Sequence, residues 1–287
     1  MIWQQLFNGL TVGSTYSLIA IGYTLIFGVL RIINMAHGQI FIFGSLVGLA
    51  VTVNSGLPIL VAFAVSILIS GVLGVALEFS AMRPLRKKNV PHLASLISTI
   101  GFAILVEQLT HLLFGADSRA VPAVATGSYE VGPLMVRQVD LIIIVVSVVL
   151  MIVLNYWINR TKMGKALRAT AENGDTAGLL GINTNAIIIL TVCIASALGG
   201  VAGMLIGLTY SALIPTMGLT LGFKGLAVLI LGGVGSIPGA MVCGLILGMA
   251  EVLTVAYGDS SYRDAVAFGL IILILLLRPQ GLFGKKA

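Results

Sequence analysis

Long apolar runs alternate with short polar and charged stretches along the whole of this chain. A helix needs about 20 mostly apolar residues to cross a bilayer, so runs of this kind predict transmembrane helices. The pattern therefore predicts an all-α, polytopic integral membrane protein with about eight or nine hydrophobic segments, some of them short or broken. The predicted segments cover residues 6–29, 40–53, 57–81, 93–114, 141–158, 186–210, 221–234, 240–256 and 265–277.

Basic residues gather in clusters that border these segments, and cytoplasmic loops of membrane proteins carry an excess of Lys and Arg. The clusters are therefore predicted to face the cytoplasm. Counting segments back from the first cluster places the N-terminus, which lacks Lys and Arg, on the outer side. The first segment is expected to be retained, because no positive region precedes it as in a secretory signal. The clusters consist of Arg83, Arg86, Lys87 and Lys88, of Arg160, Lys162, Lys165 and Arg168, and of Arg278, Lys285 and Lys286.

Composition limits the number of domains. Hydrophobic residues make up 58% of the chain and charged residues 9%, so no stretch remains that would fold as a second, soluble domain. Residues 1–287 are predicted to form one transmembrane domain. The formal charge of +6 does not indicate nucleic-acid binding, because the basic residues border apolar segments, where anionic headgroups account for them. Cys193 and Cys243 lie inside apolar segments and are expected to be buried thiols.

Residues that would carry catalysis or bind a cofactor are scarce. His37, His92 and His111 are far apart, and no His pairs with a carboxylate at the spacing of metal ligands. Gly164 and Lys165 do not form a phosphate-binding loop, because the Ser or Thr that would bind magnesium does not follow them. We expect no catalytic, metal-binding or cofactor-binding residues, and any ATP would be bound by another chain.

Glu107 is the acid placed most deeply in an apolar segment. An ionised carboxylate in hydrocarbon is costly unless it is paired or faces water, so Glu107 is expected to need Lys224 or an aqueous cavity. A proton relay through Glu107 would make the protein a secondary carrier. Such a relay usually requires several acids, and only Glu78 and Glu251 are further candidates, which favours a structural role.

Two short segments are punctuated in a related way. Residues 40–53 follow the sequence INMAHGQ, residues 240–256 follow LGGVGSIPG, and each segment carries two glycines at small-xxx-small spacing. A weak internal repeat is therefore predicted. Interrupted segments in corresponding positions of a transporter often line the substrate path, although a packing kink would leave the same pattern. The candidate residues of the path are Asn34, His37, Gln39, Gly44, Ser236 and Gly244.

The stretch between the fifth and sixth segments reads RTKMGKALRATAENGDTAGLLGIN. Thr170 or Asn173 can cap a short helix, Glu172 and Asp175 would lie in its first turn, and Gly181 would end it. A helix of about two turns is not stable alone in water, and its apolar edge would fit the groove of a soluble partner. A helix that lies on lipid headgroups is the alternative, but the two acids disfavour it. The edge consists of Thr176, Leu179 and Leu180.

Three stretches together resemble the permeases of ATP-binding-cassette importers, and most closely the H-type permeases of high-affinity branched-chain amino acid systems. They are GSTYSLIAIGYTLIFGVLRIINMAHGQ near the N-terminus, the loop sequence given above, and LGGVGSIPGAMVCGLILGMAE followed by LRPQGLFG near the C-terminus. The resemblance spans nearly the whole chain. Permeases for small amides or urea share parts of the pattern.

The resemblance implies a multi-pass subunit of the bacterial inner membrane that moves leucine, isoleucine or valine and is not itself an enzyme. The implied partners are a second, M-type permease, two cytoplasmic ATPases that bind ATP, a periplasmic amino-acid-binding protein and membrane lipid. The loop resembles the coupling helix that enters a groove on the ATPase, although it departs from the common Glu-Ala-Ala form. The coupling residues would be Glu172, Asp175, Thr176, Ala177, Leu179, Leu180 and Gly181.

Three alternatives remain open at this point. The chain would be a permease for a related small amide or urea, a proton-coupled amino-acid carrier that uses Glu107, or a membrane scaffold that only docks a soluble partner. Dependence of uptake on ATP separates an importer from a proton-coupled carrier, and the absence of any solute flux would indicate a scaffold.

Overall fold

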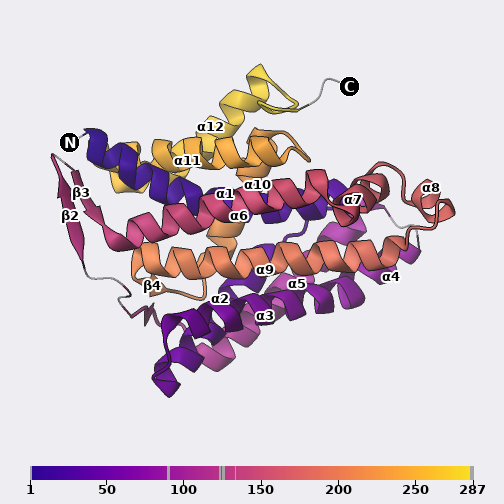
Figure 1. Cartoon of the computed structure of the whole chain (residues 1–287), viewed down its shortest axis with the longest axis horizontal. Coiled ribbons are helices and arrows are strands. Elements are labelled where there is room, and N and C mark those ends of the chain that lie inside the picture. Colours follow the sequence, from indigo (N-terminus) through magenta and orange to yellow (C-terminus); the bar gives the residue numbers. More distant parts are fainter. Residues whose placement is uncertain (1, 89–90, 123, 125–126, 133, 285–287) are drawn as a thin grey trace.

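The structure is a bundle of long helices with two small pairs of strands at one end (Figure 1). The computed structural model describes residues 2–88, 91–122, 124, 127–132 and 134–284. Lys285 and Lys286 of the third basic cluster lie outside the described residues.

The α-helices of the described chain are α1 (Ile2–Leu30), α2 (His37–Ser55), α3 (Ile59–Leu77), α4 (Arg83–Lys87), α5 (His92–Phe114), α6 (Gln138–Arg160), α7 (Lys162–Glu172), α8 (Gly174–Leu179), α9 (Thr184–Tyr210), α10 (Met217–Gly232), α11 (Ile237–Tyr257) and α12 (Arg263–Leu277). A π-helical turn, Glu78–Met82, joins α3 to α4, and a 3₁₀ turn, Ser260–Tyr262, precedes α12. The strands form two antiparallel pairs: β1 (Arg119–Ala120) with β4 (Ala212–Leu213), and β2 (Ser128–Val131) with β3 (Leu134–Arg137).

Eight helical stretches among the described residues are long and apolar enough to cross a membrane. One of them, Ile59–Lys87, continues through α3, the π-helical turn and α4. α10 is apolar but has only 16 residues, a length of about 24 Å, which is shorter than the hydrocarbon core. The predicted all-α, polytopic architecture is confirmed, and each predicted segment corresponds to one of these helices.

The two ends of the bundle differ in their content of basic residues. α4, α7 and α8 lie at one end, and the N-terminus and the β2–β3 hairpin lie at the other (Figure 1). Ser236 and Pro238 line a cavity together with Asn159 and Arg168, so α11 starts at the same end as α7. The first two basic clusters therefore share one end of the molecule, as a cytoplasmic face requires.

α1 and α9 form the centre of the bundle. In their most apolar stretches 89% and 72% of the residues are buried, compared with 6% for the stretch Ser260–Leu277 that contains α12. Hydroxyl groups are buried within α1 because they bond to its own backbone: Ser14 donates to the carbonyl oxygen of Leu10 at 2.7 Å, and Ser17 donates to that of Gly13 at 2.9 Å. Polar side chains can therefore occupy the centre without lacking a partner.

Glycines bring α1 and α11 into backbone contact. A Cβ atom on Gly13 would lie 2.7 Å from the Cα atom of Leu245, and a Cβ atom on Gly244 would lie 2.6 Å from the Cα atom of Ser17. Gly248 lies against Gly13 in the same contact. Helices in lipid have no hydrophobic drive to associate, so this close packing of backbones is what holds α1 and α11 together.

α2, α3 and α9 meet in a second contact of small residues. Gly44 faces Ser70 of α3, and Gly48 faces the backbone of the same helix. Ser66 of α3 donates to the carbonyl oxygen of Gly200 in α9 at 2.9 Å. The paired glycines of the first punctuated segment are thus packed between helices, where a larger side chain has no room.

Replacing Gly13 with Ala is expected to destabilise the protein by about 1–3 kcal/mol, because the added methyl group has to separate two backbones. Gly28→Ala is the matched control in the same helix, since a Cβ atom there meets nothing within 4 Å. The measurement is the midpoint of thermal unfolding of the purified protein in detergent. Equal midpoints for the two variants would mean that the contact of α1 with α11 does not depend on glycine.

Candidate functional site

Two helices begin inside the bundle rather than at its ends. After α1 the chain turns back through Arg31, whose φ is 52°, and α2 begins at His37. α10 begins at Met217, and a Cβ atom on Gly38 of α2 would overlap the carbonyl oxygen of Gly218. The N-termini of α2 and α10 therefore meet, and we call this place the α2–α10 junction.

The junction lies beside the middle of α9 and the second half of α1. The ring of His37 packs edge-on against Tyr23, with 4.7 Å between the ring centroids, and it also lies next to Gly22 and Gly199. A helix that starts at this depth holds its first-turn N–H groups away from water. The residues at the N-cap positions of α2 and α10, Ala36 and Thr216, make no capping hydrogen bond through a side chain.

The polar side chains at the junction are buried and lack partners among the described residues. Asn34, His37 and Gln39 are 1%, 0% and 1% exposed. Both ring nitrogens of His37, both polar side-chain atoms of Gln39 and the Nδ2 of Asn34 have no hydrogen-bond partner within the described chain. The Oδ1 of Asn34 accepts from the backbone N–H of Ala36 at 3.0 Å. Buried polar groups without partners are rare and costly, so this concentration calls for an explanation.

The other residues of the predicted path lie elsewhere. Gly44 is in the contact of α2 with α3, and Gly244 is in the contact of α11 with α1. Ser236 accepts from the N–H of Gly239 at 3.1 Å and so caps α11 at the end of the bundle that carries α7. The structure thus places His37 and Gln39 in the first turn of α2 and Asn34 just before it, with His37 facing α1 and α9 and Gln39 facing α10. The part that each of the six residues plays in transport stays a prediction.

The prediction of an interruption before residues 240–256 is corrected by the structure. The glycine-rich stretch there is a turn between α10 and α11, and α11 is continuous over 21 residues. The broken counterpart of α2 is α10. The sequence contained a signal for the start of α10, because Pro215 and Gly218, which both disfavour a continuous helix, lie at this point of the chain.

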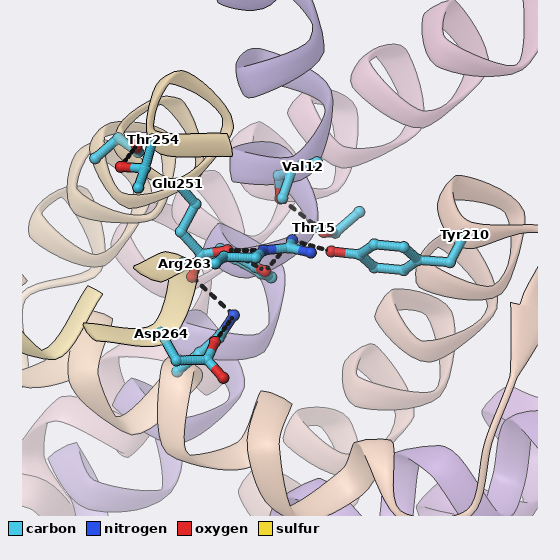
Figure 2. A network of polar contacts seen from close by, with 10 residues as sticks. Val12, Thr15, Tyr210, Glu251, Thr254, Arg263 and Asp264 are labelled. Carbon is cyan, nitrogen blue, oxygen red and sulfur yellow. Dashed lines mark hydrogen bonds and ion pairs between the residues drawn. The ribbon is translucent and has the colours of Figure 1, made fainter. Parts of the chain in front are cut away.

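A network of charges lies toward the other end of the bundle, where α11 meets α12. The Nζ of Lys224 lies 2.9 Å from Glu251 and 2.8 Å from Asp264. Figure 2 shows Arg263 between Glu251 and Tyr210, with a distance of 2.8 Å from its Nε to Glu251 and a hydrogen bond to the Tyr210 hydroxyl. These contacts tie α9, α10, α11 and α12 to one another.

The centre of this charge network is buried. The side chains of Lys224 and Glu251 are 4% and 0% exposed, and Tyr16 of α1 donates to Glu251 at 2.9 Å. The network contains two cations, Lys224 and Arg263, and two carboxylates, Glu251 and Asp264, so its charges balance. Buried charges are tolerated only when they are paired and hydrogen-bonded, so Lys224 and Arg263 depend on the buried carboxylate of Glu251, whereas the more exposed Asp264 matters less.

The expected pairing of Glu107 with Lys224 is wrong, because Lys224 pairs with Glu251 and Asp264. Glu107 is half-buried on α5 and forms no ion pair with another described residue. Glu78, at the π-helical turn, lies 2.8 Å from Arg86. Two of the three acids considered for a proton relay are therefore held in ion pairs.

The loop between α6 and α9 folds into two short helices at the end of the bundle. Thr161 caps α7 by accepting from Gly164 at 3.0 Å, and the Oδ1 of Asn173 caps α8 by accepting from Thr176 at 3.0 Å. Gly181 follows α8 with a φ of 84°, in the left-handed region that favours glycine.

Two details of this loop differ from expectation. Glu172 is the last residue of α7 rather than part of the first turn of α8, because the extended backbone of Asn173 separates the two helices. Thr170 lies inside α7 and donates to its own helix instead of capping the next. Ala177 is buried, whereas Leu179 and Leu180 are 89% and 76% exposed. α8 is thus anchored on one side and presents two leucines on the other.

Among the described residues, no three His, Cys, Asp or Glu side chains are grouped so that they would hold a metal ion. Helices that begin at depth in an all-α membrane domain occur in transport proteins, where they border the substrate path.

Comparisons with known proteins identify the family. The family described as branched-chain amino acid transport system / permease component matches residues 5–275. The chain is 41% identical to the high-affinity branched-chain amino acid transport system permease protein BraD of Pseudomonas aeruginosa, over 98% of this chain and 95% of that protein. It is 40% identical to the corresponding protein LivH of Escherichia coli K12, with the same coverage. The chain belongs to this family of transport permeases.

A solved structure has a similar fold. It is described as a metal-chelate type ABC transporter in an inward-facing conformation. The matched region covers 94% of this chain and 85% of the other chain. The TM-score is 0.51 and the sequence identity is 17%, so the likeness concerns the fold alone.

The charge network generates a prediction about stability. Glu251→Gln is expected to cost about 3 kcal/mol or more, because it leaves Lys224 and Arg263 without their shared, fully buried carboxylate. Asp264→Asn is the matched control: it loses a contact of almost the same length to the same ammonium group, but its side chain is 55% exposed, so the loss is expected to be much smaller. Thermal unfolding in detergent provides the measurement. Equal losses would show that burial does not determine the strength of this network.

Proposed function

We propose that this chain is the permease subunit of an ATP-binding-cassette importer that moves the branched-chain amino acids leucine, isoleucine and valine across a bacterial inner membrane. The proposal is supported by relatives named for this transport, which align over nearly the full length of the chain. ATP is bound by two cytoplasmic ATPase subunits, and a periplasmic binding protein delivers the amino acid. No cofactor is proposed for the permease itself.

The observation that carries this proposal is the exposed pair Leu179 and Leu180 at the tip of α8. Large apolar side chains on the aqueous side of a membrane protein are a typical sign of a docking surface. The capping side chain of Asn173 and the buried Ala177 hold α8 in place. Asp175 and Thr176 lie beside the two leucines. A short amphipathic helix of this kind fits an apolar groove on a soluble partner. The ATPase is the proposed partner, and the coupling residues are those predicted from the sequence.

A second permease of the M type is proposed to pack beside α5. Gln108 is exposed on α5, and Glu107 and His111 are half-buried there. The spacing of these three residues places them on one side of the helix. Polar side chains on a membrane-spanning helix favour contact with protein or an aqueous path over contact with lipid. A partner at this surface would enclose such a path, and Glu107 would then face water or protein instead of hydrocarbon.

The proposed path for the amino acid passes the α2–α10 junction, where Asn34, His37 and Gln39 are buried at and just before the start of α2. Gly44 and Gly244 would keep the adjoining helices close, and Ser236 would lie at the cytoplasmic side. A proton-coupled carrier is less well supported, because Glu78 and Glu251 are engaged in ion pairs.

Transport in reconstituted vesicles tests the function. Vesicles that contain the chain with its partner subunits and binding protein are expected to accumulate leucine, isoleucine and valine when ATP is supplied on the ATPase side, and to continue when the proton gradient is collapsed. Uptake of urea or a small amide in their place would select the related permease. Uptake that follows the proton gradient would select a carrier, and the absence of flux would select a scaffold.

Docking through α8 is tested by the double variant Leu179→Glu with Leu180→Glu. It is expected to lose retention of the ATPase during purification and ATP-driven uptake, because an unpaired carboxylate in an apolar groove costs at least about 1–3 kcal/mol. Met163→Glu on α7 is the control, since it places one such carboxylate on another exposed apolar residue of the loop. If the double variant retains the ATPase and transports normally, α8 lies on headgroups instead of in a groove.

A further inference from the structure

The α2–α10 junction combines two positive helix ends. α2 has 19 residues and α10 has 16, so each carries the partial positive charge of free first-turn N–H groups at its N-terminus. Gln39 lies against the first turn of α10: a Cβ atom on Gly218 would be 2.5 Å from the Oε1 of Gln39. Two such ends that face each other away from water repel, and an anion between them would remove the repulsion.

The unpartnered side chains at the junction supply further donors. Gln39 and Asn34 each have an amide NH₂ group, and neutral His37 has one ring N–H. All three side chains are at most 1% exposed, and the atoms concerned lack partners among the described residues. The unpartnered acceptors there are the Oε1 of Gln39 and the second ring nitrogen of His37, so donor groups, together with the first-turn N–H groups, outnumber acceptors. A ligand that completes it needs acceptor oxygens and negative charge.

The junction is shut in this structure, but its contacts allow opening. Gly38 meets Gly218 and Gly222 through backbone atoms, and a flexible side chain of α2, that of Gln39, lies against Gly218. The opposite end of α10 is held more firmly, since the N–H of Leu282 donates to the carbonyl oxygen of Leu231 at 2.8 Å. Leu219 and Phe223 of α10 are exposed, so the helix borders the outside of this subunit. A shift of the N-terminal end of α10 would connect the junction to that surface.

We propose that the α2–α10 junction binds the carboxylate of the transported amino acid, through the first-turn N–H groups of both helices and the side chain of Gln39. The proposal rests on the proposed function and names the group of the substrate that this site recognises. Broken helices in other transporter folds receive anionic groups in the same manner, because half-helix N-termini point at the site. The apolar side chain of the substrate would lie toward Leu219 and Phe223.

Substitution of Gln39 separates this role from a structural one. Gln39→Met keeps the length of the side chain and removes two polar atoms that lack partners, so it is expected to leave stability unchanged or raise it. Uptake of leucine by the reconstituted complex is nevertheless expected to fall about tenfold or more, because a hydrogen bond to a charged group is lost. Ser147→Ala is the matched control: Ser147 is 0% exposed and its Oγ also lacks a partner within the described chain, but it lies on α6. Ser147→Ala is expected to transport at the normal rate.

A direct measurement on the unmodified complex uses two ligands that differ only in the carboxyl group. Without binding protein or nucleotide, millimolar L-leucine is expected to raise the thermal unfolding midpoint of the permease complex, and L-leucinamide is not. Gln39→Met is expected to abolish the shift with leucine. Equal shifts with both ligands, no shift with leucine, or normal transport by Gln39→Met would overturn the inference. If leucine shifts the midpoint but none of the three amino acids is transported, the proposed function fails and the carboxylate site stands.

Discussion

The hydrocarbon core contains no water to bond to a backbone group, and this constraint decides where a helix of this protein can begin. α2 and α10 start at depth, so their first turns have to be enclosed by protein. α1 and α9 provide the enclosure because they carry glycines where the junction lies. Gly22 and Gly199 leave the space that the ring of His37 fills. Small residues thus do two things here: they hold neighbouring helices together, and they open an interior in which a helix can be interrupted.

Polar groups are treated differently in two parts of the bundle. In the outer network, Lys224, Glu251 and Arg263 are paired with one another, and Asp264 and the tyrosine hydroxyls take up the remaining donors. At the junction, neutral side chains are as buried as Lys224 and Glu251, but several of their polar atoms lack partners among the described residues. A fully paired network fixes the helices that it joins, whereas an incompletely bonded site costs stability until a ligand arrives. This contrast is the physical reason for assigning the first a structural role and the second a role in transport.

The sequence was sufficient for the helices and the docking loop, because both depend on local patterns. Apolar runs of the right length predict spans, and Asn173 and Gly181 are the residues that begin and end α8. Tertiary contacts were out of reach: the partners of Lys224 come from α11 and α12, and no local pattern distinguishes them from Glu107. The start of α10 was missed although Pro215 and Gly218 mark it in the sequence, because its depth in the bundle is set by contact with α2.

α10 links these features mechanically. Its cytoplasmic end is held by backbone hydrogen bonds from Leu282 and Phe283. Lys224 fixes its middle to α11 and α12, about 9 Å along the helix from Gly218. The N-terminal end lies against α2 through Gly38 and the flexible side chain of Gln39. A helix held at one end and in the middle moves most easily at its other end, which in α10 is the end at the junction.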